Sequence, residues 1–236
     1  MKIKPFLIIA LGLVAIAAIA VAADPITLKR TVTVGETLKY KLTASFDAGQ
    51  VGSQATVTGD ITNKITKIES NGNFDVESTQ QNLKIDVGGQ TIDGDSGTTK
   101  TTVMQPNGQL VEIRGENLSP QDYRLAALNE VIFPDKPVNM GDSWSATIPD
   151  NAKTGAVAAT LNYVLVSEET VDTIDSYKIS IVIKETKGDT PASSTGTVWV
   201  SKADGSVVKS NMAWVNAPVP AAPNPITGTY TVDREP

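Results

Sequence analysis

Apolar and polar side chains alternate along much of this chain, and a period of two restricts it to β-structure. Successive side chains of a strand point to opposite faces, so an alternating stretch buries one face and exposes the other. The clearest stretch runs from 37 to 46, where the apolar positions are Leu38, Tyr40, Leu42, Ala44 and Phe46. The alternation recurs over residues 161–165, 177–183 and 226–232, and less clearly over 55–69 and 74–87. The pattern predicts a mainly β fold.

Three dipeptides between such stretches are typical of tight hairpin turns: Asn71-Gly72, Asn107-Gly108 and Asp204-Gly205. Asn, Asp and Gly tolerate the positive backbone angles that these turns require. Charged residues make up only 19% of the chain, and its many Thr, Val and Ser residues suit half-buried strands better than helices. We therefore predict an antiparallel sheet.

One helix is predicted near residues 120–129. Ser119 offers an N-cap hydroxyl, Pro120 suits the first helical position, and Asp122 places an acidic group in the first turn. Leu125 and Leu128 then follow at helical spacing. Because the apolar stripe is narrow, we interpret this helix as a short connection lying on the sheet.

The body shows a faint internal duplication, with three motifs recurring in the same order about one hundred positions later. The matched pairs are Gly35–Leu38 with Gly141–Trp144, 68–76 with 171–179, and 103–111 with 200–208. We predict two similar halves, residues 24–118 and 132–236, joined either as one curved sheet or as two small domains. The alternative is an accidental likeness between strand-rich segments.

Residues 1–23 have the layout of a secretory signal peptide. Lys2 and Lys4 precede an apolar run that closes on the small residues Ala20 to Ala23. The run is also long enough for an uncleaved membrane anchor. In both cases the body, residues 24–236, is predicted to be exported to the periplasm or the cell exterior as part of the cell envelope. The chain has no Cys, so it must fold without disulfides.

The composition argues against most catalytic sites. There is no His, which removes Ser-His-Asp and Cys-His arrangements and imidazole metal ligands. No pair of carboxylates stands in an apolar stretch that would separate their pKa values. The net charge of −6 with scattered basic residues gives no footprint for nucleic acid. We predict a non-enzymatic protein with no catalytic residues, no metal site, no cofactor and no nucleic-acid partner.

Two segments, residues 132–144 and 196–210, resemble parts of uncharacterised exported bacterial β-proteins that are loosely related to the LolA-like lipoprotein carriers. The resemblance covers about a third of the chain. It implies an open, half-barrel-like curved antiparallel sheet whose concave side holds acyl chains. The chain has one predicted helix where those carriers use several.

Two functions follow from these observations. The first is a carrier that binds a lipid or another apolar ligand, or a lipoprotein, on its curved sheet. The candidate ligand-binding residues are Leu38, Tyr40, Leu42, Tyr177, Ile179 and Ile181. The second is a structural or interaction module of the envelope without a ligand cavity, whose core would use the same residues. Contact with a membrane is expected only through an uncleaved N-terminal segment.

Overall fold

The computed structural model describes residues 24–47, 54–94, 97–220, 222 and 224–235. The predicted signal peptide, residues 1–23, lies outside these ranges. Within the described part of the chain, twelve strands and one helix are present. All the strands join one antiparallel sheet. The prediction of a mainly β fold with a single short helix is confirmed.

The first half-sheet comprises β1 (Thr37–Asp47), β2 (Gln54–Ile68), β3 (Phe74–Val87), β4 (Gln90–Asp93), β5 (Thr99–Met104) and β6 (Leu110–Arg114). The second comprises β7 (Ser143–Ile148), β8 (Ala159–Val171), β9 (Ile174–Glu185), β10 (Ser193–Ser201), β11 (Val207–Ala217) and β12 (Ile226–Arg234). The strand order is β6-β5-β3-β2-β1-β12-β11-β10-β9-β8-β7, with β4 paired to β3. Each half is thus a meander of hairpins.

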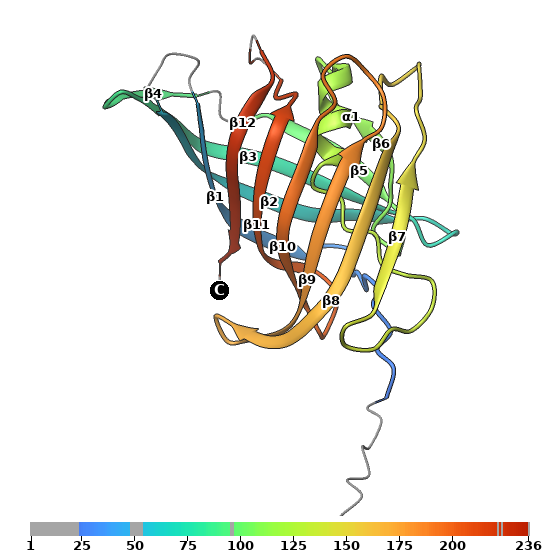
Figure 1. Ribbon diagram of the computed structural model, residues 1–236. Coiled ribbons are helices and arrows are strands. Elements are labelled where there is room, and N and C mark those ends of the chain that lie inside the picture. The colour runs from blue at the N-terminus through green and yellow to red at the C-terminus, as the bar shows by residue number, and fades with distance from the viewer. Residues whose placement is uncertain (1–23, 48–53, 95–96, 221, 223, 236) are drawn as a thin grey trace, which may run out of the picture.

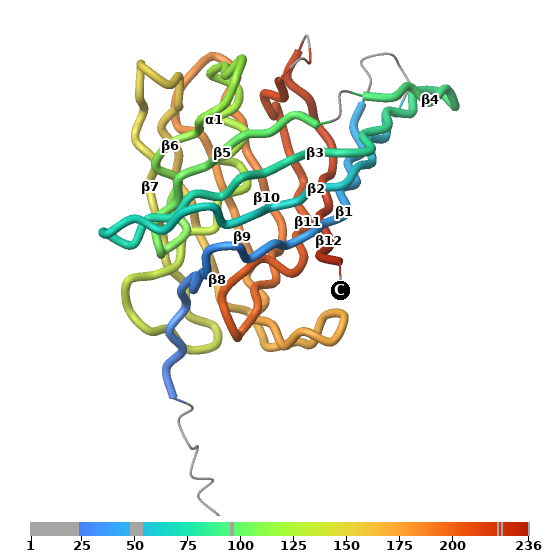
Figure 2. Tube along the Cα trace, turned by 180° about the vertical axis from the view of Figure 1, so that it is seen from behind, coloured from blue at the N-terminus to red at the C-terminus, as the bar shows by residue number. Residues whose placement is uncertain are grey.

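The two half-sheets are continuous through the pairing of β1 with β12, in which Leu42 lies opposite Val232. β6 and β7 end the strand order, so the sheet stays open. Figures 1 and 2 show that the sheet curls on itself, so that the strands of the first half cross behind those of the second. The inner faces of the two halves therefore face one another.

The halves share local hydrogen-bonding details as well as strand order. The N–H of Gly35 donates to the Ile65 carbonyl at 2.8 Å, and that of Gly141 donates to the Leu165 carbonyl at 2.7 Å. Both glycines have positive φ angles, of 90° and 87°. The register of β2 against β3 shifts after Ile65, and that of β8 against β9 shifts after Leu165. These features occupy corresponding places in the two meanders.

Each half-sheet is preceded by a segment that contacts a hairpin of the other half. The first lead-in (residues 26–35) donates from the Thr31 N–H to the Asp204 carbonyl at 2.8 Å. The second lead-in (residues 128–141) donates from the Phe133 N–H to the Asn107 carbonyl at 2.7 Å. The lead-ins also bond to each other between Ile26 and Val138. This reciprocal crossing holds the two half-sheets together.

The helix α1 (Pro120–Ala127) connects the halves and ends two residues before the predicted boundary. The Asp122 carboxylate accepts the N–H of Ser119 at 2.8 Å, which satisfies a free donor at the helix start. Arg124 donates two hydrogen bonds of 2.6 Å to the Glu185 carboxylate at the end of β9. A bidentate pair of this kind fixes both distance and orientation, so it anchors α1 to the second half-sheet.

The main hydrophobic core lies between the second half-sheet and the segments that cover it. Its most buried residues on β8 and β9 are Leu161, Tyr163, Leu165, Ile179, Ile181 and Ile183, all exposed by 1% or less. Leu128, Ile132 and Phe133 of the second lead-in and Leu28 of the first pack onto them. No helix in the described ranges has the length and hydrophobicity needed to cross a bilayer.

Candidate functional site

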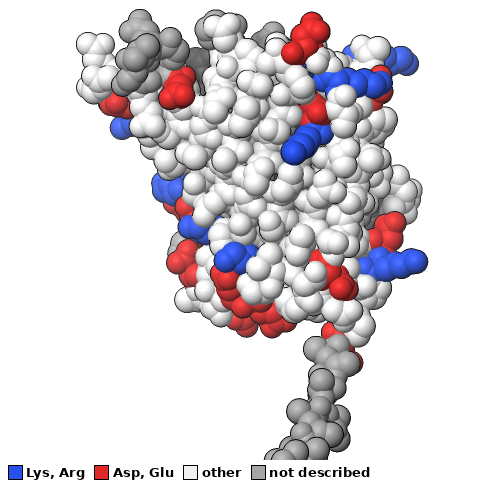
Figure 3. Space-filling view, viewed as in Figure 1, with Lys and Arg blue, Asp and Glu red and all other residues white. Residues whose placement is uncertain are grey.

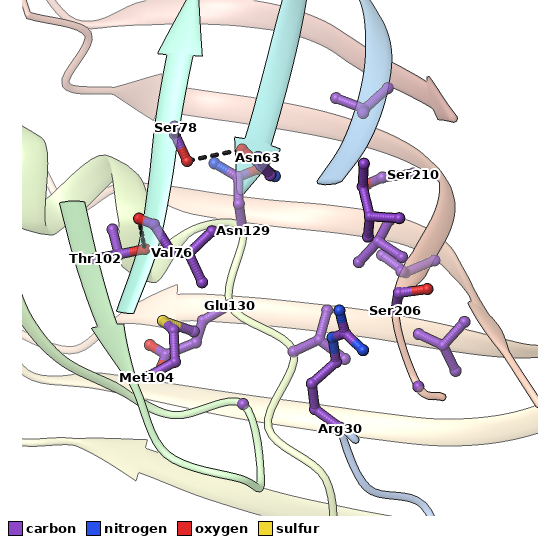
Figure 4. Close-up of a pocket in the computed structure, with 18 of the residues that line it drawn as sticks. Arg30, Asn63, Val76, Ser78, Thr102, Met104, Asn129, Glu130, Ser206 and Ser210 are labelled. Carbon is purple, nitrogen blue, oxygen red and sulfur yellow. Dashed lines mark hydrogen bonds between the residues drawn. The ribbon is translucent and has the colours of Figure 1, made fainter. Parts of the chain in front are cut away.

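A pocket of about 400 Å³ lies between the two half-sheets. Volumes of this order are typical of small-molecule sites. One wall comes from β1, β2, β3 and β5, the opposite wall from β10, β11 and β12, and the second lead-in lies between them (Figure 4). Most lining side chains are apolar: Leu38, Tyr40, Ile61, Ile65, Phe74, Val76, Met104, Leu110, Val131, Phe133, Val198, Val200, Val207, Tyr230 and Val232.

Eight polar or charged residues interrupt this lining: Arg30, Asn63, Ser78, Thr102, Asn129, Glu130, Ser206 and Ser210, all labelled in Figure 4. Several of them bond to neighbouring protein groups. The Ser78 hydroxyl donates to Asn63 Oδ1 at 2.7 Å across the β2–β3 pair. The Ser206 hydroxyl donates to Asp204 Oδ1 at 2.7 Å. These contacts satisfy part of the hydrogen-bonding capacity of the wall.

Glu130 is the acidic group of the pocket, and it is 6% exposed. Its Oε1 accepts the Leu110 N–H at 2.6 Å, while its own backbone carbonyl accepts the Tyr163 hydroxyl at 3.0 Å. Glu130 takes part in none of the ion pairs found among the described residues. Burial raises the pKa of its carboxyl to about 7, against the lowering effect of the Leu110 N–H.

Arg30 also lines the pocket, but its guanidinium is occupied by the protein. It pairs with the Glu36 carboxylate and lies 4.0 Å from an oxygen of Asp204. It also donates to the carbonyls of Thr31 and Asp204. These bonds attach the first lead-in to the β10–β11 hairpin, so we interpret Arg30 as part of the junction between the half-sheets.

Two tyrosines contribute apolar surface to the pocket. Tyr40 donates its hydroxyl to the Val207 carbonyl at 3.1 Å, and burial raises its pKa to about 12. Tyr230 stacks on Trp214 with ring centroids 4.7 Å apart, and burial raises its pKa as well. Both hydroxyls therefore stay protonated near neutral pH and act as neutral groups.

Asn129 has one side-chain atom without a partner. Its Nδ2 donates to the Leu125 carbonyl at 2.9 Å, which closes the end of α1. Its Oδ1 is buried and accepts no hydrogen bond. A buried acceptor without a donor destabilises the folded state by about 1–3 kcal/mol. The unpaired Oδ1 therefore lowers stability at a position next to Glu130.

The structure does not bring the six predicted ligand-binding residues together. Leu38 and Tyr40 line the pocket. Leu42 lies in a small cluster with Tyr40 and Val232. Ile179 and Ile181 are buried in the main core, and Tyr177 packs against its margin. Leu42, Tyr177, Ile179 and Ile181 are therefore placed away from the pocket lining.

Sequence reasoning did not single out the polar residues of the pocket. Glu130 stands directly before the apolar run Val131–Phe133, and a carboxylate next to such a run is a signal of burial that could have been used. Asn63 and Ser78 give no comparable signal, because each has polar residues on both sides in β2 or β3. Their position in the pocket follows from how the sheet curls.

Comparisons with known proteins identify no family for this chain. No protein-family model matches the chain, and no curated protein is significantly similar to it. Among solved structures, the chain is similar to the hypothetical lipoprotein YmcC from Escherichia coli (K12). The TM-score is 0.34 with 16% sequence identity, over 86% of this chain and 89% of that one.

Proposed function

We propose that this protein is a non-enzymatic component of the cell envelope, exported by its N-terminal segment, that carries a lipid or another apolar molecule. The observation that carries the proposal is the pocket of about 400 Å³ between the half-sheets, with its largely apolar lining. An apolar cavity with a few placed polar groups is the usual form of a small-molecule site. The absence of His from the sequence supports binding over catalysis.

Trp214 offers a direct readout for this proposal. Its ring stacks on Tyr230, which lines the pocket, whereas Trp144 stacks on Tyr163 in the core and Trp199 donates to Glu169. A Trp144→Phe and Trp199→Phe double variant leaves Trp214 as the reporter. Titration with dodecanol is expected to change its fluorescence in a saturable way.

A pair of phenylalanine variants tests whether binding uses this pocket. Val76 lines it, so Val76→Phe fills part of its volume and should weaken dodecanol binding about tenfold or more. Val166 is 46% exposed, and Val166→Phe is the matched control with unchanged affinity. Equal binding by both variants, with both folded, would place the ligand elsewhere. Absence of any saturable binding to the folded protein would reject the carrier.

A second candidate function, an interaction module, is favoured by the outer face of the second half-sheet. Figure 3 shows that the middle of this face is largely uncharged, with charged side chains mostly near its margins. Val164, Val166 and Val215 are exposed there by 37%, 46% and 46%. Concentration-dependent association measured by analytical ultracentrifugation, abolished by Val166→Lys, would favour this function over the carrier.

A further inference from the structure

Glu130 occupies a place that the fold fills with an apolar side chain in the other half. In the first lead-in, the Lys29 carbonyl lies against Gly205, and in the second the Val131 carbonyl lies against Gly108. The residue before Lys29 is Leu28 and the residue before Val131 is Glu130. Leu28 is 5% exposed and belongs to the main core. The architecture accepts a hydrocarbon at this position, so it does not require a carboxyl there.

The surroundings of Glu130 offer acceptors in excess of donors. Asn129 presents a buried Oδ1 with no donor. Both residues directly follow the C-terminal end of α1, where the helix dipole disfavours negative charge. The Leu110 N–H donates to Oε1 of the Glu130 carboxylate. The second oxygen, Oε2, accepts no hydrogen bond from the other described residues.

The hydrogen-bond donors on the pocket wall do not supply the donors that these acceptors lack. Arg30 is held by Glu36, Thr31 and Asp204. The hydroxyls of Tyr40, Ser78, Thr102 and Ser206 donate to protein oxygens. The Asn63 amide N–H₂ and the hydroxyls of Ser210 and Tyr230 remain among the described lining residues, and all three are neutral. Arg30 is the cation among the described lining residues and is already paired, while Arg234 donates to the Ser206 hydroxyl from beside the pocket. A carboxylate head group placed at Glu130 would therefore lie against a like charge in an apolar surrounding, which is costly.

We propose that the natural ligand is an amphiphile whose head group is a hydrogen-bond donor, a hydroxyl or an amine, which binds Glu130, and that carboxylate-headed chains such as fatty acids are rejected while Glu130 is ionised. This inference rests on the carrier function proposed above and specifies its ligand class. The apolar chain lies along Ile61, Val76, Val198 and Val200. The head group supplies the donor that Glu130 Oε2 lacks.

The test compares three probes with the same chain: dodecanol, dodecylamine and dodecanoate. The amine and the carboxylate are titrated into the full chain below their critical micelle concentrations and dodecanol below its solubility limit. The pH is about 8, where a carboxyl with a pKa of about 7 is mostly ionised. Isothermal titration calorimetry and the total tryptophan fluorescence of the unmodified chain report binding. We expect dodecanol and dodecylamine to bind about tenfold or more tightly than dodecanoate, since a hydrogen bond to a charged group is gained and a like-charge contact is avoided.

A variant of Glu130 assigns the discrimination to this residue. Glu130→Gln keeps an oxygen that accepts the Leu110 N–H but removes the charge and adds a donor. The preference over dodecanoate should then fall to about twofold or less. Glu77→Gln is the matched control, because Glu77 follows the pocket residue Val76 on β3 and points to the opposite face. It should keep the full preference.

The outcomes separate this inference from the carrier function. If dodecanoate binds to the unmodified protein as tightly as dodecanol, the head-group inference is wrong and the carrier function stands. If none of the three probes binds to the folded protein, both fail. Because the probe series uses the unmodified chain, the result does not depend on whether Glu130→Gln folds.

Discussion

The two half-sheets follow the same plan but line their inner faces differently. In the second half, three facing pairs of β8 and β9 are Leu165–Ile179, Tyr163–Ile181 and Leu161–Ile183. At the corresponding places of β2 and β3 the pairs are Ile65–Val76, Asn63–Ser78 and Ile61–Gln80. The β8–β9 pair of the second half therefore belongs to the core, and the corresponding β2–β3 pair of the first half lines one wall of the pocket. The same backbone arrangement serves both roles, because the side chains of one face can change without altering the hydrogen-bonded ladder.

The two halves should differ most in the stability that is lost when Tyr163 or Asn63 is replaced by alanine. Tyr163 is fully buried, stacks on Trp144 and bonds to Ile132 and Glu130 through its hydroxyl. Tyr163→Ala should lower the free energy of unfolding by about 4 kcal/mol, and Asn63→Ala by about 1 kcal/mol. Urea denaturation measures both. Equal losses would show that the two inner faces contribute alike.

The second prediction concerns Glu130, which stands where the first lead-in has the apolar Leu28. Burial raises the pKa of Glu130 from 4.5 to about 7. The folded state then holds a proton that the unfolded chain has released, so this contribution to stability is present below about pH 4.5 and is lost as the pH rises through 7. Glu130→Gln, which cannot ionise, should gain about 3 kcal/mol relative to the unmodified protein between about pH 4.5 and 8. Urea melts at several pH values, with Glu77→Gln as control, measure the gain. A pH-independent difference would contradict it.

The third prediction concerns a place where the halves should behave alike. Gly108 and Gly205 have φ of 88° and 70°. A Cβ at either would lie 2.2 or 2.1 Å from the carbonyl oxygen of Val131 or Lys29. Gly108→Ala and Gly205→Ala should each cost about 2 kcal/mol from backbone strain and displacement of a lead-in. Thermal unfolding compares them, and a cost confined to one variant would break the correspondence between the halves.

The smallest change in stability is expected when the polar Asn63–Ser78 pair is replaced by apolar residues like those on the inner face of the second half. Asn63→Leu with Ser78→Ile removes both partners of one hydrogen bond, so no polar atom is orphaned. The double variant should raise the free energy of unfolding by about 1 kcal/mol while abolishing dodecanol binding. Urea denaturation and calorimetry test the two effects together. Unchanged binding would show that the Asn63–Ser78 pair lies outside the ligand path.

Much of the fold could be predicted from local patterns. The alternation at 37–46 matches β1, and the Ser119–Asp122 signature matches the start of α1. Asn107-Gly108 and Asp204-Gly205 lie in the β5–β6 and β10–β11 hairpins. These features depend on residues close in the sequence, for which period and turn chemistry are sufficient. The predicted duplication stays a prediction, supported by the matched bonds at Gly35 and Gly141.

The pocket could not be predicted in the same way. Tyr177, Ile179 and Ile181 alternate as clearly as Leu38 and Tyr40, but the first three belong to the core region and the last two line the pocket. Alternation identifies which side chains share a face, and it does not say what covers that face. The second lead-in covers the second half-sheet, so the prediction of ligand-binding residues mixed the two environments.

Period, capping and the conformational freedom of Gly were sufficient to predict six of the strands, the start of the helix and three hairpin turns. The pairing of β1 with β12, the crossing of the lead-ins and the burial of Glu130 beside a pocket became visible only in the folded chain. The reason is physical: these contacts join segments far apart in the chain. Their stability comes from surface buried jointly by both halves, which no local pattern records.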